Sequence, residues 1–162
     1  RFKNVSSNHK SETQNVDSIM FLNMPRDLTL NELFKHFEGK WIFIDLWATW
    51  CVPCLQEFGF EKKLLQLLQA KDITPLYISL DNDSENDHWK SLVRSKTLLG
   101  YHLRASKELS ENLKKNIYND SDFTDIPRYI LVNPHGTIVD TNLPRPSNIN
   151  NLKLVLDTLL KN

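Results

Sequence analysis

The fold is decided by residues 41–54, which read Trp41-Ile42-Phe43-Ile44-Asp45-Leu46-Trp47-Ala48-Thr49-Trp50-Cys51-Val52-Pro53-Cys54. Residues 41–47 have the length of a strand and are apolar on both faces. This pattern is expected in the middle of a sheet that helices cover on both sides. Pro53 suits the first turn of a helix, which we expect to run to about Ala70. The two cysteines therefore lie between a buried strand and the start of a helix.

The other predicted elements surround this stretch. We expect further strands at 73–80, 101–104, 129–133 and 137–140, and helices at 31–37, 89–96, 106–116 and 148–161. The early strands require parallel pairing through crossovers, whereas the Pro134-His135-Gly136 turn predicts an antiparallel hairpin. The predicted fold class is therefore α/β, with a central mixed β-sheet flanked by helices on both faces.

Length and composition indicate a single domain. The 162 residues would fill one domain with a sizeable core. Residues 1–18 are polar and lack periodicity, so we expect a flexible arm or linker there and the domain over 19–162.

Twenty basic residues balance twenty acidic ones, which gives no reason to expect nucleic acid as a partner. We expect a monomer. The chain starts at Arg1 without a methionine or an apolar signal segment, so a signal or membrane anchor would not be visible in it.

The chain has only two cysteines, three positions apart. This count excludes a four-cysteine zinc site and is too small for a disulfide framework, leaving a redox pair or half of a metal site. At a helix start, unpaired N–H groups would stabilise a Cys51 thiolate and lower its pKa from about 8.5 into the range of roughly 3.5 to 7.5. We therefore expect Cys51 to attack a partner disulfide and Cys54 to resolve the mixed disulfide.

A metal site would need further ligands near the cysteines. The histidines are scattered singly, and we interpret each as a surface or loop residue: His9, His36, His88, His102 and His135. We expect no metal, and no cofactor other than the redox-active Cys51–Cys54 disulfide.

Asp45 interrupts the central apolar strand six residues before Cys51. Burial disfavours the anion, so its pKa should be raised. We interpret Asp45 as a catalytic residue that exchanges a proton with Cys54; the alternative is a strand-end acid bonded to backbone or solvent.

Residues 45–54 resemble the active-site stretch of the thioredoxin superfamily. Within it, the chain is most similar to the TlpA/ResA-like extracytoplasmic thiol–disulfide oxidoreductases, in the variant common in Bacteroidetes. The similarity rests also on Gly39-Lys40, on Glu57 and on the segment from Ile126-Pro127 to Val139, and the likeness to the Bacteroidetes variant rests on Leu143-Pro144-Arg145-Pro146-Ser147.

This resemblance implies a thioredoxin-like fold and thiol–disulfide exchange with partner proteins, with the chain acting as a reductase. It implies that the Ile126-Pro127 bond is cis and faces the cysteines. The residues assigned to substrate binding are Trp50, Pro53, Ile126, Pro127 and Trp47. The family also implies a periplasmic or membrane-anchored location facing the periplasm, a membrane electron donor, and partners such as apocytochromes in cytochrome maturation.

Several features depart from the family pattern. Val52 stands where some ResA-like relatives carry an acid, and Arg128 follows Pro127 where thioredoxins have a small hydroxyl residue. A cation at Arg128 would favour acidic partners or assist the thiolate. The family's lysine near the buried acid has no counterpart in residues 73–80.

Two alternative functions stay open from the sequence. A thiol peroxidase of the peroxiredoxin type shares this fold, but it needs a threonine and an arginine beside its cysteine, and Thr49 is wrongly placed for that. A copper-handling protein would use the two thiolates and a distant histidine such as His135. Its usual spacing has three residues between the cysteines, whereas two are present here.

Overall fold

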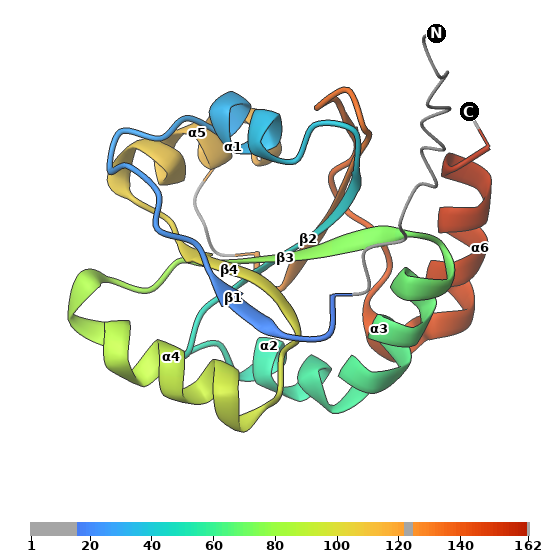
Figure 1. Cartoon of the computed structure of the whole chain (residues 1–162), viewed down its shortest axis with the longest axis horizontal. Coiled ribbons are helices and arrows are strands. Elements are labelled where there is room, and N and C mark those ends of the chain that lie inside the picture. The colour runs from blue at the N-terminus through green and yellow to red at the C-terminus, as the bar shows by residue number, and fades with distance from the viewer. Residues whose placement is uncertain (1–15, 122–124, 162) are drawn as a thin grey trace, which may run out of the picture.

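The structure, a computed structural model, describes residues 16–121 and 125–161. Most of the predicted arm, residues 1–18, lies outside the described residues, as does His9, so the division into arm and domain stays a prediction. In the described part, six strands form one sheet in the order β1-β4-β3-β2-β5-β6 (Figure 1). The strands are β1 (Ile19–Phe21), β2 (Trp41–Trp47), β3 (Ile73–Ser79), β4 (Gly100–Arg104), β5 (Arg128–Val132) and β6 (Ile138–Asp140).

The sheet is mixed, as predicted. Strands β1, β4, β3 and β2 pair in parallel, and β5 and β6 join as an antiparallel hairpin. The α-helices are α1 (Leu30–His36), α2 (Val52–Glu57), α3 (Glu61–Ala70), α4 (Asn86–Ser95), α5 (Lys107–Ile117) and α6 (Ile149–Leu159). In Figure 1, α1 and α5 lie on one side of the sheet, and α2, α3 and α4 on the other. The predicted α/β class is therefore confirmed.

The central position of β2 explains its composition. It pairs with β3 on one side and β5 on the other, and residues 42–47 are all buried. Because successive side chains of a strand point to opposite faces, Ile42, Ile44 and Leu46 pack in the core cluster that also holds residues of α1 and α5. Phe43 packs on the other face, against leucines of α3 and α6. Asp45 therefore shares the face of Phe43.

The structure differs from the predicted elements in two places. The helix expected from Pro53 to Ala70 is divided into α2 and α3 by a short 3-10 segment, Phe58–Phe60. Gly59 is a weak helix former, and the break lets Phe58 turn into the core. Strand β1 was not predicted, because three residues are too few to show a strand period; it pairs with β4 at the edge of the sheet.

No helix among residues 16–121 and 125–161 is long and apolar enough to cross a membrane.

Candidate active site

The two cysteines form a disulfide at the start of α2. Their Cα atoms are 5.3 Å apart, and Cys51 is the N-cap residue, whose Sγ accepts a hydrogen bond from the backbone N–H of Cys54 at 3.2 Å. Both side chains are buried, with 3% and 1% of their surface exposed. Solvent exposure in this oxidised state therefore does not show which cysteine attacks and which resolves. The assignment of these roles rests on the position of Cys51 at the N-terminus of α2.

Ile126 and Pro127 face the disulfide from the start of β5. Their peptide bond is cis, as predicted, and the carbonyl oxygen of Ile126 lies 3.7 Å from Sγ of Cys51. Both side chains are buried, so this segment offers its backbone at the site. Pro53 lies exposed in the first turn of α2. The segment thus forms a wall opposite the cysteine pair.

The two tryptophans near the site differ in exposure. Trp50 has 64% of its surface exposed and lies next to Cys51, together with the exposed Val52. Trp47 has no exposed surface, and its ring packs edge-on against Phe58 at 5.0 Å. The assignment of Trp47 to the substrate-binding surface is therefore wrong. It is the last residue of β2 and faces the covered side of the sheet, so it supports the site from within the core.

The guanidinium of Arg128 is held within the protein. It forms an ion pair with Asp125 at 2.6 Å, donates to the carbonyl oxygen of Thr141, and lies over the ring of Tyr118. Only 13% of the Arg128 side chain is exposed. This arrangement braces the chain around Pro127 and does not present a free cation to a partner, contrary to the expectation from the sequence.

Asp45 lies in a row of side chains that crosses the sheet. Cross-strand register places Asp45 opposite Tyr77 and Tyr129, and places Tyr77 opposite His102. Residues in register point to the same face of a sheet. The ring of His102 stacks on that of Tyr77 at 4.5 Å and is fully buried, so the expectation of a surface or loop histidine is wrong here.

Three carboxyls gather on the face of the sheet that carries Asp45. Asp45 is 3% exposed, and its Oδ1 has no hydrogen-bond partner among the residues that the structure describes. Glu57, at the end of α2, accepts hydrogen bonds from the backbone N–H and the hydroxyl of Ser147, and Glu61, at the start of α3, accepts one from the hydroxyl of Tyr77. Burial raises the pKa of Asp45 well above its usual range, and the charges of Glu61 and Glu57 raise it further.

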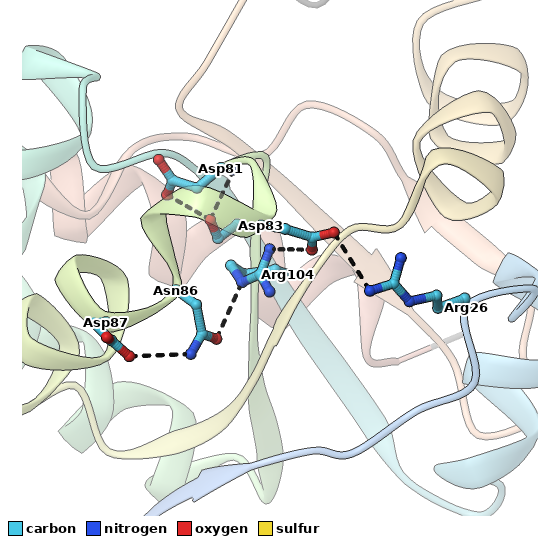
Figure 2. A network of polar contacts seen from close by, with 7 residues as sticks. Arg26, Asp81, Asp83, Asn86, Asp87 and Arg104 are labelled. Carbon is cyan, nitrogen blue, oxygen red and sulfur yellow. Dashed lines mark hydrogen bonds and ion pairs between the residues drawn. The ribbon is translucent and has the colours of Figure 1, made fainter.

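A buried carboxylate holds the segment that carries Trp50. Asp81, which follows β3, accepts hydrogen bonds from the backbone N–H of Thr49 at 3.0 Å, from its hydroxyl at 2.7 Å, and from the hydroxyl of Ser79 at 2.6 Å. Figure 2 shows the neighbouring exposed network, in which Asp83 binds Arg104 at 2.9 Å and Arg26 at 3.6 Å. Asp81 thus ties the turn before Cys51 to the end of β3.

Comparison with known proteins agrees with this site. A family model, Redoxin, matches residues 9–156. The chain belongs to the Redoxin family. Among its relatives is Thiol-disulfide oxidoreductase ResA from Bacillus cereus (strain ZK / E33L), 26% identical over 106 residues. That match covers 65% of this chain and 56% of the relative, so the chain spans little more than half the length of this curated relative.

Solved structures share the fold of this Redoxin-family chain. A solution structure of a protein from Bacteroides vulgatus is 29% identical, with a TM-score of 0.62 and coverage of 79% of both chains. A thiol-disulfide oxidoreductase from Bacteroides fragilis NCTC 9343 is 26% identical, with a TM-score of 0.56 and coverage of 74% of this chain and 84% of that one. The thioredoxin-like fold and the resemblance to ResA-type proteins are confirmed.

Two buried acids near the site of this Redoxin-family chain, Glu61 and Asp81, were not predicted from the sequence. Glu61 follows Glu57 by four residues and precedes Leu64 by three, which places it on the apolar stripe of its helix. An acidic residue on the apolar face of a helix indicates a buried carboxyl, so the burial of Glu61 could have been predicted from the sequence. The role of Asp81 was not visible, because its partner Thr49 lies 32 positions away in the chain.

The copper hypothesis fails on the position of His135. This residue lies in the β5–β6 turn, beside the start of β2, where the amide of Gly39 donates to the carbonyl oxygen of Pro134. The cysteines follow the other end of β2, about 20 Å away for a strand of this length. In the part of the chain that the structure describes, no group of three or more His, Cys, Asp or Glu side chains could hold a metal ion.

Replacing Asp45 by asparagine is expected to stabilise the oxidised protein increasingly as the pH rises. The pKa of Asp45 is raised in the folded state, so the unfolded chain loses this proton first. From about pH 4 upward the wild type therefore loses stability that the Asp45→Asn variant keeps. Urea unfolding of both proteins between pH 4 and pH 8 measures the difference, with exposed Asp27→Asn as the matched control. A difference that stays constant across this range would contradict the assignment.

Proposed function

We propose that the protein catalyses thiol–disulfide exchange with partner proteins, with Cys51 as the attacking and Cys54 as the resolving cysteine. The observation that carries the proposal is the Cys51–Cys54 disulfide at the start of α2, facing the carbonyl of Ile126 in the cis Ile126–Pro127 segment. In the reduced state, the Cys54 N–H that now contacts the Cys51 sulfur would stabilise a thiolate there.

The reaction proceeds in two displacements. The Cys51 thiolate attacks one sulfur of the partner disulfide, which forms a mixed disulfide and releases the other partner sulfur as a thiolate that takes a proton. The Cys54 thiol then loses its proton to Asp45 and attacks the Cys51 sulfur. The Cys51–Cys54 bond forms, and the second partner thiolate leaves and is protonated. Two electrons have passed from the protein to its partner.

The placement of Asp45 supports its role in the second step. Cys54 and Glu57 are three residues apart on α2 and both are buried, so they share its inward face. Asp45 lies on the face of β2 that carries Phe43, and the charge of Glu57 on α2 contributes to its raised pKa. A carboxyl whose pKa is raised toward that of a thiol is well matched to accept a proton from one.

The partner binds along the wall formed by Ile126 and Pro127, with the exposed Trp50 and Pro53 on the other side of the disulfide. We propose that the protein acts as a reductase outside the cytoplasm, in the periplasm or anchored facing it, and is itself reduced by a membrane electron donor. This location and donor are what the resemblance to extracytoplasmic oxidoreductases implies. Cytochrome maturation is a candidate process on the same ground.

Turnover and the reduction potential test the proposal together. The wild type is expected to accelerate the reduction of insulin disulfides by dithiothreitol, and absence of acceleration would contradict exchange. A Cys51–Cys54 potential near about −270 mV, measured against glutathione or dithiothreitol buffers, supports a reductase, whereas one near about −120 mV marks an oxidant and overturns the direction.

The peroxidase alternative is disfavoured by two contacts. The hydroxyl of Thr49 donates to Asp81, and the guanidinium of Arg128 is paired with Asp125. Neither group is free to bind a peroxide beside Cys51, so peroxide-dependent turnover is not expected.

A further inference from the structure

Glu61 is a buried carboxyl that the proposed exchange steps do not use. It is 6% exposed, whereas Leu64 and Leu68 occupy the other buried positions of α3. Its Oε1 accepts a hydrogen bond from the Tyr77 hydroxyl. Burial raises the pKa of Glu61 to about 7, although the bond from Tyr77 acts in the opposite direction. Burying an acid that has one hydrogen-bond donor among the described residues is costly for the fold, which points to a functional reason for Glu61.

Tyr77 connects Glu61 to Asp45. The strand register places Tyr77 directly opposite Asp45, while its hydroxyl reaches Glu61 on α3. Burial raises the pKa of Tyr77 well above its usual range, so this hydroxyl stays a donor. Asp45 and Glu61 are therefore both buried on the same side of the sheet, where an ionised Glu61 disfavours the anion of Asp45.

We propose that Glu61, held by Tyr77, is a positioning residue that sets how readily Asp45 accepts the proton of Cys54. The inference rests on the proposed exchange function and deepens it. When Glu61 is ionised, its charge makes Asp45 a stronger base toward the thiol. When Glu61 is protonated, Asp45 loses its own proton at lower pH. The proton of Cys54 passes only to Asp45, and Glu61 acts through its charge.

Of the titratable groups around Asp45, Glu61 is the one whose pKa lies near neutral pH. Glu57, on α2, raises the pKa of Asp45 less than Glu61 does. Tyr129 is in register with Asp45 from β5, and burial raises its pKa despite the charge of Arg145. His102 stacks on Tyr77, and burial lowers its pKa to about 4, so it is neutral at pH 7.

The resolving step can be followed directly against pH. Reduced protein is mixed with dithiobis(nitrobenzoate), and release of the second thionitrobenzoate reports the attack of Cys54 on Cys51. In Glu61→Gln, the inflection of this rate with pH is expected about one pH unit below that of the wild type, because the like charge is gone. Tyr77→Phe removes the donor, keeps Glu61 neutral over a wider range and shifts the inflection in the same direction by less.

A double variant and a matched control separate this role from a general structural one. Glu61→Gln combined with Tyr77→Phe is expected to match Glu61→Gln alone, since both changes act through the same charge. The control is Glu111→Gln, an exposed glutamate on α5, which should leave the profile unchanged. If the wild type shows no second release, exchange itself fails. If it does and the Glu61→Gln profile coincides with it, only the role of Glu61 is overturned.

A measurement on the folded wild type guards against variants that do not fold. Carbon-13 NMR of labelled carboxyls follows Glu61 and Asp45 in the wild type, where Glu61 is expected to lose its proton first. In Glu61→Gln, Asp45 is expected to titrate at lower pH than in the wild type, because the like charge is gone. Loss of the Asp45 proton before that of Glu61 in the wild type, or an unchanged Asp45 titration in the variant, would overturn the proposal.

Discussion

Replacing Cys54 by serine is expected to accumulate covalent complexes between Cys51 and partner cysteines. Without the Cys54 thiol, the mixed disulfide formed in the first displacement has no internal nucleophile to resolve it. The loss of the Cys51–Cys54 bond also frees the Cys51 sulfur at the end of α2. Non-reducing electrophoresis after incubation with a disulfide-bonded protein detects the complexes, and dithiothreitol should release them.

The Cys51→Ser variant is the matched control, because it changes the same atom at the other cysteine. It is expected to form no complexes and to lose turnover of insulin by about 1000-fold or more, since the attacking thiolate is absent. Complexes trapped by Cys51→Ser and absent with Cys54→Ser would reverse the assigned roles. The experiment is needed because both cysteines are almost equally buried, so exposure does not distinguish them.

Replacing Asp81 by alanine is expected to lower the free energy of unfolding by about 3 kcal/mol. The carboxylate is 2% exposed and accepts bonds from the backbone N–H and hydroxyl of Thr49 and from the hydroxyl of Ser79. Its removal leaves buried donors without an acceptor in the turn that carries Trp50. Urea unfolding measures the loss, and a fall in the rate of exchange should accompany it because Trp50 and Cys51 are less firmly placed.

Two further variants make this prediction specific. Asp81→Asn keeps the shape and one acceptor oxygen, so it should lose less stability than Asp81→Ala. Asp83→Ala removes an exposed acid two positions away, paired with Arg104 and Arg26, and should change stability far less, because ion pairs in solvent contribute little. Equal losses for Asp81→Ala and Asp83→Ala would show that the bonds to Thr49 do not stabilise the fold.

Elements formed by interactions between residues close together in the sequence could be predicted, and elements that depend on residues far apart in the sequence could not. The β2 strand was predicted residue for residue, since six apolar residues among seven positions and a following helix start are local signals. The start of the helix expected at 106–116 also agrees with the structure, where the hydroxyl oxygen of Ser106 accepts the N–H of Leu109 at 3.2 Å and caps α5. The break at Phe58–Phe60 was not predicted, because the apolar period continues across it. The weak helix propensity of Gly59 becomes decisive only together with the packing of Phe58 against Trp47.

In the active site, too, some features could be predicted from local sequence and others were set only by the tertiary structure. Local sequence determined the cysteine pair, its place at a helix start and the acid six residues before it; the resemblance to known oxidoreductases added the cis Ile126–Pro127 bond. Only the tertiary structure decided that Trp47 is covered and that Arg128 is paired. It also decided that Tyr77 stands opposite Asp45 with Glu61 bonded to it. Strand register and helix packing join residues distant in the chain, and no local pattern encodes which acid meets which hydroxyl.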